Sequence, residues 1–182
     1  GLTLLSVSLM LIATLCISFL TFNFLADYLG APFVPTSAKA VDQILKRAKL
    51  KKGQVFIELG SGDGRLIIMA AKNYGVLGVG VEINPLLVWY SRLMAKLSLV
   101  SNLQFRQENL FNTDLRSASV IFFFLTPRTI KKVINKITQQ CKPKTLIISH
   151  GFKIRELDQC LIDMIERPVF STYFYSLRDP FK

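Results

Sequence analysis

Charged residues are absent from the first 26 positions of this 182-residue chain, and acidic residues are scarce after them. Residues 28–182 hold 23 basic and 11 acidic residues, a net charge of +12. The three cysteines, at positions 16, 141 and 160, form neither a metal-ligand spacing nor an even disulfide set, so we expect no metal site and a reduced compartment. No repeat or low-complexity tract is present, which excludes fibrous and disordered classes. The chain therefore has two parts, an uncharged apolar start and a basic body of about 150 residues. The body is long enough to bury a core.

The uncharged start predicts a membrane anchor. As a helix, residues 2–26 would reach about 37 Å at about 1.5 Å per residue, which crosses a bilayer with some tilt. A cleavable signal peptide fits less well, because Phe24 and Leu29 are large where small residues precede a cleavage site. A buried core helix is the alternative, but it would need a larger protein around it. We therefore expect residues 1–26 to form a single-pass anchor.

The residues that follow the anchor predict where the body lies. Basic side chains gather soon after it, so the positive-inside rule places the body on the cytoplasmic, or equivalent interior, side of the membrane. Gly30, Pro32 and Pro35 favour an extended linker over residues 27–35. We expect residues 36–182 to form one domain.

Hydrophobic periodicity divides this body into alternating helices and strands. We expect one helix capped by Thr36 or Ser37 and others over residues 65–73, 85–99 and 128–140. Strands are expected over residues 55–59, 78–83, 103–107, 119–125 and 144–149, and a closing hairpin over residues 161–165 and 170–177. The alternation predicts an α/β fold with a doubly wound, mainly parallel sheet and an antiparallel C-terminal edge hairpin.

The strongest motif is E-L-G-S-G-D-G-R at residues 58–65, between the first strand and its helix. Its glycines allow a ligand to lie against the backbone, and the following helix offers unpaired N–H groups. The spacing is not the dinucleotide fingerprint, because bulky Arg65 follows the third glycine, and no Walker lysine is present. Glu82, at the end of the second strand, is placed where a carboxylate accepts both hydroxyls of a ribose. Together the two features predict a nucleoside-containing ligand.

These residues resemble the class I S-adenosylmethionine-dependent methyltransferases, which have a Rossmann-like fold. P-F-V-P-T-S at 32–37 and V-E-I-N-P at 81–85, behind an apolar segment, are more narrowly similar to small membrane-anchored protein-lysine methyltransferases. Known eukaryotic members act on mitochondrial membrane proteins such as the c-type rotor protein of ATP synthase and the adenine nucleotide translocase. The resemblance implies S-adenosylmethionine as cofactor and a membrane-associated protein as substrate.

The resemblance also implies a set of cofactor contacts. The glycine turn would hold the methionine part, Glu58 would orient its amino group, and Glu82 would hold the ribose. Asn109 stands where the family usually carries an aspartate near the adenine. The full set is Glu58, Gly60, Ser61, Gly62, Asp63, Gly64, Glu82, Ile83, Asn84, Asn109 and Leu110.

Methyl transfer chiefly requires a positioned, neutral nucleophile, so we assign no catalytic residue. Pro35, Thr36, Thr126 and Pro127 are the candidates that line the active site. His150 fits a structural role better than that of a base. The fourth strand lacks both the N/D-P-P-Y/F motif of amide-nitrogen methylation and the Pro-Cys pair of cytosine C5 chemistry, which makes nucleic acid less favoured but not excluded. Methylation of RNA or of a small molecule, and a non-catalytic membrane-tethered module, remain alternatives.

Overall fold

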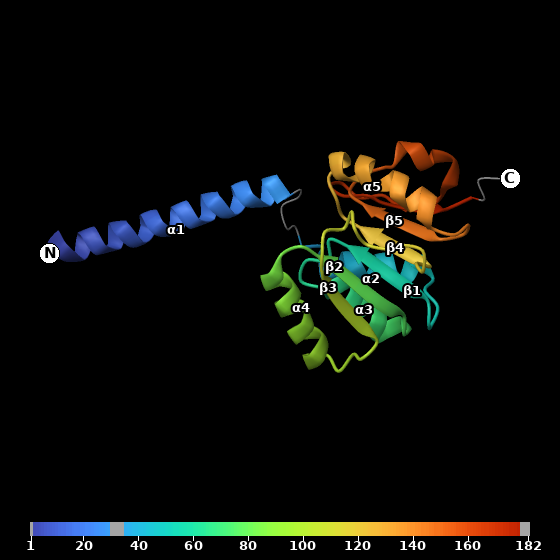
Figure 1. The fold of residues 1–182 in the computed structure, drawn as a ribbon, viewed down its shortest axis with the longest axis horizontal. Coiled ribbons are helices and arrows are strands. Elements are labelled where there is room, and N and C mark those ends of the chain that lie inside the picture. Colours follow the sequence, from blue (N-terminus) through green and yellow to red (C-terminus); the bar gives the residue numbers. More distant parts are fainter. Residues whose placement is uncertain (1, 30–34, 179–182) are drawn as a thin grey trace. The chain divides into compact units, whose positions relative to one another are not determined.

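The computed structural model describes residues 2–29 and 35–178 and divides the chain into two units, Gly1–Val34 and Pro35–Lys182. Helix α1 (Leu2–Leu29) makes up the first unit (Figure 1). It includes residues 27–29, which the sequence assigns to the linker, and linker residues 30–34 lie outside the described part. No helix among the described residues combines the length and hydropathy that a bilayer crossing requires, so the span predicted over residues 1–26 is not confirmed.

A seven-stranded sheet forms the centre of the second unit (Figure 1). Its strands in chain order are β1 (Val55–Leu59), β2 (Leu77–Glu82), β3 (Leu103–Gln107), β4 (Val120–Phe123), β5 (Leu146–His150), β6 (Leu161–Ile165) and β7 (Thr172–Ser176). The spatial order is β3-β2-β1-β4-β5-β7-β6, and the first five are parallel. This confirms the predicted Rossmann-like sheet, and it brings the carboxyl ends of β1 to β5 to one edge, where such sheets bind ligands.

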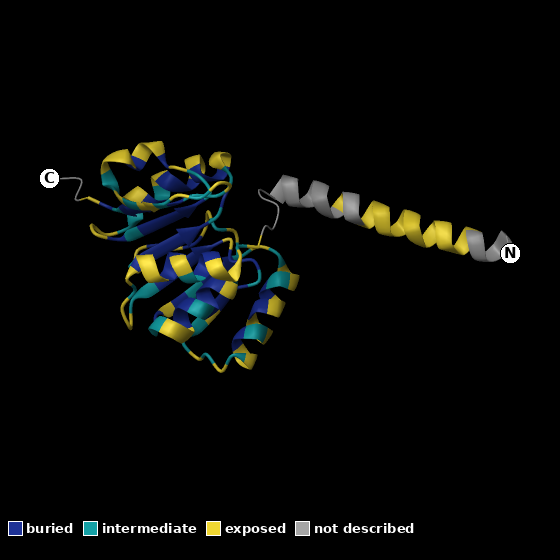
Figure 2. Ribbon diagram, turned by 180° about the vertical axis from the view of Figure 1, so that it is seen from behind, coloured by how far each residue is buried: buried dark blue, intermediate teal, exposed yellow. Residues whose placement is uncertain are grey.

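Helices cover both faces of this sheet, with α4 and α5 on opposite sides (Figure 1). Helices α2 (Ala38–Ala48), α3 (Arg65–Tyr74) and α4 (Pro85–Leu97) pack against one face, and α5 (Pro127–Gln140) with the 3₁₀ helix η1 (Arg155–Cys160) packs against the other. As predicted, Ser37 caps α2, its Oγ accepting a hydrogen bond from the Ala40 N–H at 3.3 Å. The strands are mostly buried, and the helices expose their outer faces (Figure 2).

The C-terminal strands confirm the predicted antiparallel hairpin at the edge of the sheet. β7 lies between β5 and β6 and is antiparallel to both, so β6 forms the edge and runs parallel to β5. Phe174 and Tyr175 of β7 are 1% and 0% exposed. Burial of these aromatic rings on the two faces of the sheet favours an interior position for the last strand.

Candidate active site

The turn between β1 and α3 is held in a left-handed backbone conformation at its three glycines. Gly60, Gly62 and Gly64 have φ angles of +76°, +54° and +76°, which residues with a Cβ adopt only with strain. The N–H groups of Gly60 and Ser61 donate to the Val81 carbonyl oxygen at 2.8 and 2.9 Å. The turn is therefore fixed to the end of β2, and its exposed Gly60 presents bare backbone at the carboxyl edge of the sheet.

Two residues that the sequence analysis missed support this turn from behind. A Cβ on Gly64 would stand 2.7 Å from the Phe105 ring, so the turn lies directly against β3. Ser91 is fully buried in α4, and its single hydroxyl proton is shared between the Leu87 carbonyl oxygen at 2.8 Å and the Gly62 carbonyl oxygen at 3.0 Å. The only signal in the sequence was a serine on the side of this helix that also carries Val88 and Ala95, where a buried hydroxyl needs a hydrogen-bond partner.

Glu58 is the last residue but one of β1, just before the turn, and is 5% exposed. Its Oε2 accepts a hydrogen bond from the Ile67 N–H of α3 at 3.2 Å. Burial raises the pKa of the Glu58 carboxyl well above its usual range, although the bond from Ile67 opposes the rise, and the Asp63 and Glu82 carboxylates add to it. A carboxyl placed in this way gains a partner when a cation arrives beside it.

The Ser61 hydroxyl is a second polar group in the turn with unused capacity. Its Oγ is buried and makes no hydrogen bond within the described residues. Because buried hydroxyls in native proteins nearly always have a partner, this hydroxyl keeps a hydrogen-bonding capacity that the described residues do not use. The bare backbone of Gly60, the Glu58 carboxyl and this hydroxyl together fit a small ligand that carries a cationic group.

Glu82 lies at the end of β2 with its carboxylate fixed across the turn. Its Oε2 accepts the Gly62 N–H at 2.9 Å, and its Oε1 accepts the N–H groups of Ile83 and Asn84 at 2.8 and 2.9 Å. Asn84 in turn caps α4, its Oδ1 accepting from the Leu86 N–H at 3.0 Å. The carboxylate is thus oriented before any ligand binds, and its two oxygens keep capacity for further donors such as sugar hydroxyls.

The end of β3 completes this side of the site. The Glu108 N–H donates to the Glu82 carbonyl oxygen at 3.1 Å, which places the following turn beside β2. Asn109 is exposed, and its Oδ1 accepts from the Phe111 N–H at 3.0 Å. The structure therefore brings Asn109 and half-buried Leu110 to the edge where they were predicted, with the side-chain oxygen of Asn109 already committed to its own turn.

Arg65 connects the glycine turn to the segment before α2. Its Nε donates to Asp63 Oδ2 at 2.8 Å, and its Nη1 donates to the Thr36 carbonyl oxygen at 3.2 Å. This bond places Thr36, and with it the adjacent Pro35, near the turn. The Asp63 carboxylate, which was predicted to contact the cofactor, forms an ion pair with Arg65 instead.

The end of β4 reaches the turn from the other direction. A Cβ on Gly60 would stand 3.4 Å from Leu125 Cδ2, so the residues after β4 adjoin the turn. Thr126 then caps α5, and the Thr126 Oγ1 accepts a hydrogen bond from the Thr129 N–H at 3.4 Å. Pro127 is the first residue of the helix. Both predicted pairs of lining residues are therefore brought to the same edge of the sheet.

Three rings form an aromatic cluster at this edge, beyond β4 and β5. The centroid of the Phe124 ring lies 4.7 Å from that of His150 and 4.9 Å from that of Phe170. His150 Nδ1 is 2.8 Å from Thr172 Oγ1, and burial, with a smaller effect of Arg167, lowers the pKa of His150 to about 4. The imidazole is therefore neutral near pH 7, in agreement with a structural role, and the cluster presents an apolar wall.

The fold and this site define an S-adenosylmethionine-dependent methyltransferase. Residues 58–160 match the ANTKMT methyltransferase domain, and the chain belongs to that family. It is 35% identical over 126 residues to a protein-lysine N-methyltransferase of Saccharolobus islandicus, an alignment that covers 68% of this chain and 78% of that protein. It is 29% identical over 128 residues to the mouse adenine nucleotide translocase lysine N-methyltransferase, covering 69% of this chain but only 55% of that protein.

Solved structures agree with this assignment. An RNA methyltransferase from Salinibacter ruber, solved in complex with S-adenosyl-L-homocysteine, superposes with a TM-score of 0.75 at 33% identity and covers 80% of this chain and 95% of that one. S-adenosylmethionine is therefore the cofactor. The unpartnered Ser61 hydroxyl and the buried Glu58 carboxyl at the glycine turn fit its amino-acid part.

Proposed function

We propose that this methyltransferase transfers a methyl group to the side-chain amine of lysine residues in a protein. The observation that carries the proposal is the 35% identity to the Saccharolobus islandicus protein-lysine N-methyltransferase, because it extends over 78% of that protein's length. Membership of the ANTKMT methyltransferase domain family supports the same substrate class. The family assignment also makes the chain an enzyme, so a non-catalytic cofactor-binding module is no longer needed to explain it.

We further propose that the residues of the glycine turn divide the cofactor between them. The backbone at 60–64 and the Ser61 hydroxyl would hold the amino-acid part, with Glu58 opposite its ammonium group. Glu82 would accept the ribose hydroxyls, because the structure orients both of its oxygens beside the turn. Ile83, Asn84, Asn109 and Leu110 would surround the adenine, and Asp63 would act through Arg65 by holding residues 35 and 36 in place.

The acceptor side of the site excludes water instead of supplying a strong base. When bound, S-adenosylmethionine supplies a methyl group on a positively charged sulfur, so the acceptor amine must be neutral and in line with it. Pro35, Phe124 and Phe170 offer apolar surface at this edge, and desolvation lowers the pKa of a lysine amine that enters it. His150 is buried against Thr172 and takes no proton in this proposal.

A second candidate is RNA methylation. The Salinibacter ruber structure that the chain matches at 33% identity is that of an RNA methyltransferase, and the net charge of +12 over residues 28–182 would attract a polyanion. Charge of this kind supplies affinity without selecting a substrate, so the case for RNA depends on the Salinibacter ruber structure alone. Lysine therefore remains the first candidate.

We also propose that the substrate is a membrane-associated protein and that the body works on the cytoplasmic, or equivalent interior, side of the membrane. Residues 1–26 carry no charge, and the described side chains of α1 at 6–18 and 21 are all exposed. The hydroxyls of Thr14 and Thr21 donate to the carbonyl oxygens of Met10 and Ile17 at 2.7 and 2.9 Å, so they bring no unpaired donor into an apolar environment. Attachment through α1 is part of this proposal.

The test is to incubate the purified full chain with radiolabelled S-adenosylmethionine and the protein, RNA and lipid fractions of cells that lack the gene. Label on a lysine of one or more membrane proteins, located by mass spectrometry, is the expected result. Label in RNA alone would replace this proposal with the second candidate. Glu82→Ala, checked for folding by circular dichroism, serves as the variant that should bind no cofactor and transfer no label.

A further inference from the structure

A stripe of apolar side chains runs along the outer side of α4 and is not used by the site described above. Leu86, Trp89, Tyr90, Leu93 and Leu97 have the spacing that places residues on one side of a helix. Leu86 is 75%, Trp89 64% and Leu97 67% exposed. We call these five residues the α4 stripe.

Helix α4 already buries its opposite side in the body. Val88, Ser91 and Ala95 are 1%, 0% and 7% exposed, so the helix is apolar on two sides. A surface helix ordinarily turns charged side chains outward, and a contiguous exposed apolar patch marks a binding surface. Leu99, just beyond the helix, has a φ of +56°, which is a strained conformation for leucine. Its side chain is 92% exposed, so burial in the folded chain does not compensate for this strain.

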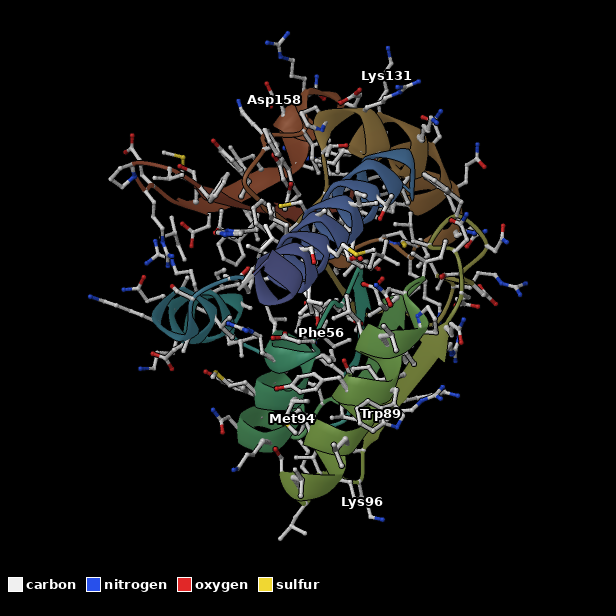
Figure 3. The ribbon with its side chains drawn as sticks, turned by 90° about the vertical axis from the view of Figure 1, so that its left-hand side faces the viewer. Phe56, Trp89, Met94, Lys96, Lys131 and Asp158 are labelled. Carbon is white, nitrogen blue, oxygen red and sulfur yellow. The ribbon has the colours of Figure 1, made fainter. Side chains whose placement is uncertain are left out.

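The charged residues within α4 and β3 all have one sign. Residues 83–107 contain Arg92, Lys96 and Arg106 and no acidic residue. Arg92 and Lys96 lie along one flank of the stripe, and Figure 3 shows Lys96 toward the C-terminal end of α4 and Trp89 nearer its start. An apolar face with a cationic flank is complementary to a lipid surface that carries negative head groups.

A shallow hollow lies between α4 and β3 on this flank. Arg92, Lys96 and Gln104 are among the residues that line it. The Arg92 Nη2 donates to the Phe105 carbonyl oxygen at 2.8 Å, which fixes the guanidinium at the hollow. A guanidinium has five N–H donors, so this bond leaves others for a ligand. A phosphate head group fits this position because Arg92 and Lys96 place two cations beside the hollow.

We propose that the α4 stripe docks on the surface of an anionic phospholipid bilayer. The leucines enter the boundary between head groups and acyl chains, Trp89 and Tyr90 lie at that boundary, where amphipathic rings are favoured, and Arg92 and Lys96 contact phosphates. Docking holds the body against the membrane whichever acceptor the active site modifies, so the proposal does not depend on lysine as the substrate.

Other occupants of the α4 stripe fit the charge pattern less well. A second copy of this chain packed stripe to stripe would bring Arg92 and Lys96 of both copies together with no acidic residue of this segment to offset them. A nucleic acid would pair with the cations but would leave the apolar stripe uncovered. A bilayer with anionic lipids satisfies both features at once.

The test uses Trp89, the single tryptophan of the chain, as its own probe. The full chain is mixed with vesicles of phosphatidylcholine and phosphatidylglycerol, with and without brominated acyl chains. We expect Trp89 emission to shift to shorter wavelength and the brominated lipid to quench it. The protein could also bind vesicles through α1 alone. In that case acrylamide would quench Trp89 and brominated lipid would not, and the proposal would be wrong. Shielding of Trp89 from both quenchers in a dimer would also overturn it.

Two substitutions with matched controls separate the apolar and charged contributions. Leu97→Gln should lower the quenched fraction severalfold, whereas Ile162→Gln, of similar exposure on the edge strand β6, should not. Lys96→Gln should reduce docking on anionic vesicles about fivefold. Lys142→Gln, at the end of α5 on the other face of the sheet, is its control. Equal effects of a variant and its control would contradict docking through α4.

Discussion

Glu58 is a carboxyl that the fold keeps out of water before any ligand arrives. Its folded-state pKa is raised, chiefly by burial, so the folded protein holds a proton that the unfolded chain releases above about pH 4.5. The apo protein is therefore expected to lose stability as pH rises from about 4.5 through the folded-state pKa. A cation beside Glu58 would reverse this cost, which is the physical reason to place a carboxyl there.

Glu58→Gln should consequently separate stability from cofactor binding. Because a neutral amide has no charge to desolvate, we expect the variant to unfold with a free energy about 1–2 kcal/mol higher than the native chain at neutral pH, provided that the amide oxygen keeps the Ile67 hydrogen bond. Denaturant unfolding across pH measures this difference. The affinity for S-adenosylmethionine, measured by calorimetry, should fall at least tenfold. Glu156→Gln, an exposed carboxyl, is the control, and parallel pH curves for native and Glu58→Gln proteins would contradict the prediction.

His150 gives a pH dependence of the opposite sign. Its folded-state pKa is about 4 against an ordinary value of 6.5, so the unfolded chain binds the proton more readily in this window. Its contribution to stability is fully present above about pH 6.5 and should be lost as pH falls toward 4, by at most about 3 kcal/mol. The thermal unfolding temperatures of the native and His150→Gln proteins should differ most near pH 7 and approach each other as the pH falls to 4. A constant difference across this range would refute the assignment.

At the scale of elements, the β1–α3 turn combines backbone strain with close packing, and the two can be measured apart. In Gly64→Ala the new Cβ would meet the Phe105 ring at 2.7 Å at a φ of +76°, so we expect a loss of about 2–4 kcal/mol. Gly53→Ala has a φ of +81° with nothing within 4 Å and should lose only about 1 kcal/mol. Urea unfolding of both variants isolates the packing contribution. Equal losses would mean that Phe105 moves aside freely.

The same turn shows how far the sequence predicts this site. Glycine spacing and the acid at the end of β2 predicted where Glu58 and Glu82 lie, because both follow from strand-to-turn geometry that is local in the chain. The supports of the turn, Phe105 and Ser91, could not be found in this way. They reach it from residues 41 and 27 positions beyond Gly64, and such contacts depend on how β3 and α4 pack.

For the whole body, the sequence predicted the strands better than their order. Two short strands separated by a few residues favour a hairpin at the sheet edge, and β6 and β7 do pair antiparallel. What the local pattern could not show is that β7 also pairs with β5, so that the last strand enters the interior of the sheet. The preference is set by burial of Phe174 and Tyr175 on opposite faces, which only the assembled sheet reveals.

This topology makes the body depend on its last residues. Without β7, the edge of β5 would be exposed and the core would lose Phe174 and Tyr175, each costing about 3–5 kcal/mol on the scale of large aromatic truncations. That loss is comparable to the stability of a whole domain. A chain that ends at Arg167 should therefore show no cooperative thermal transition by circular dichroism. A chain that ends at Arg178 keeps all of β7 and should unfold like the full chain. Cooperative unfolding of the shorter chain would show that β7 is an accessory strand, and that β1 to β5 form a core of their own.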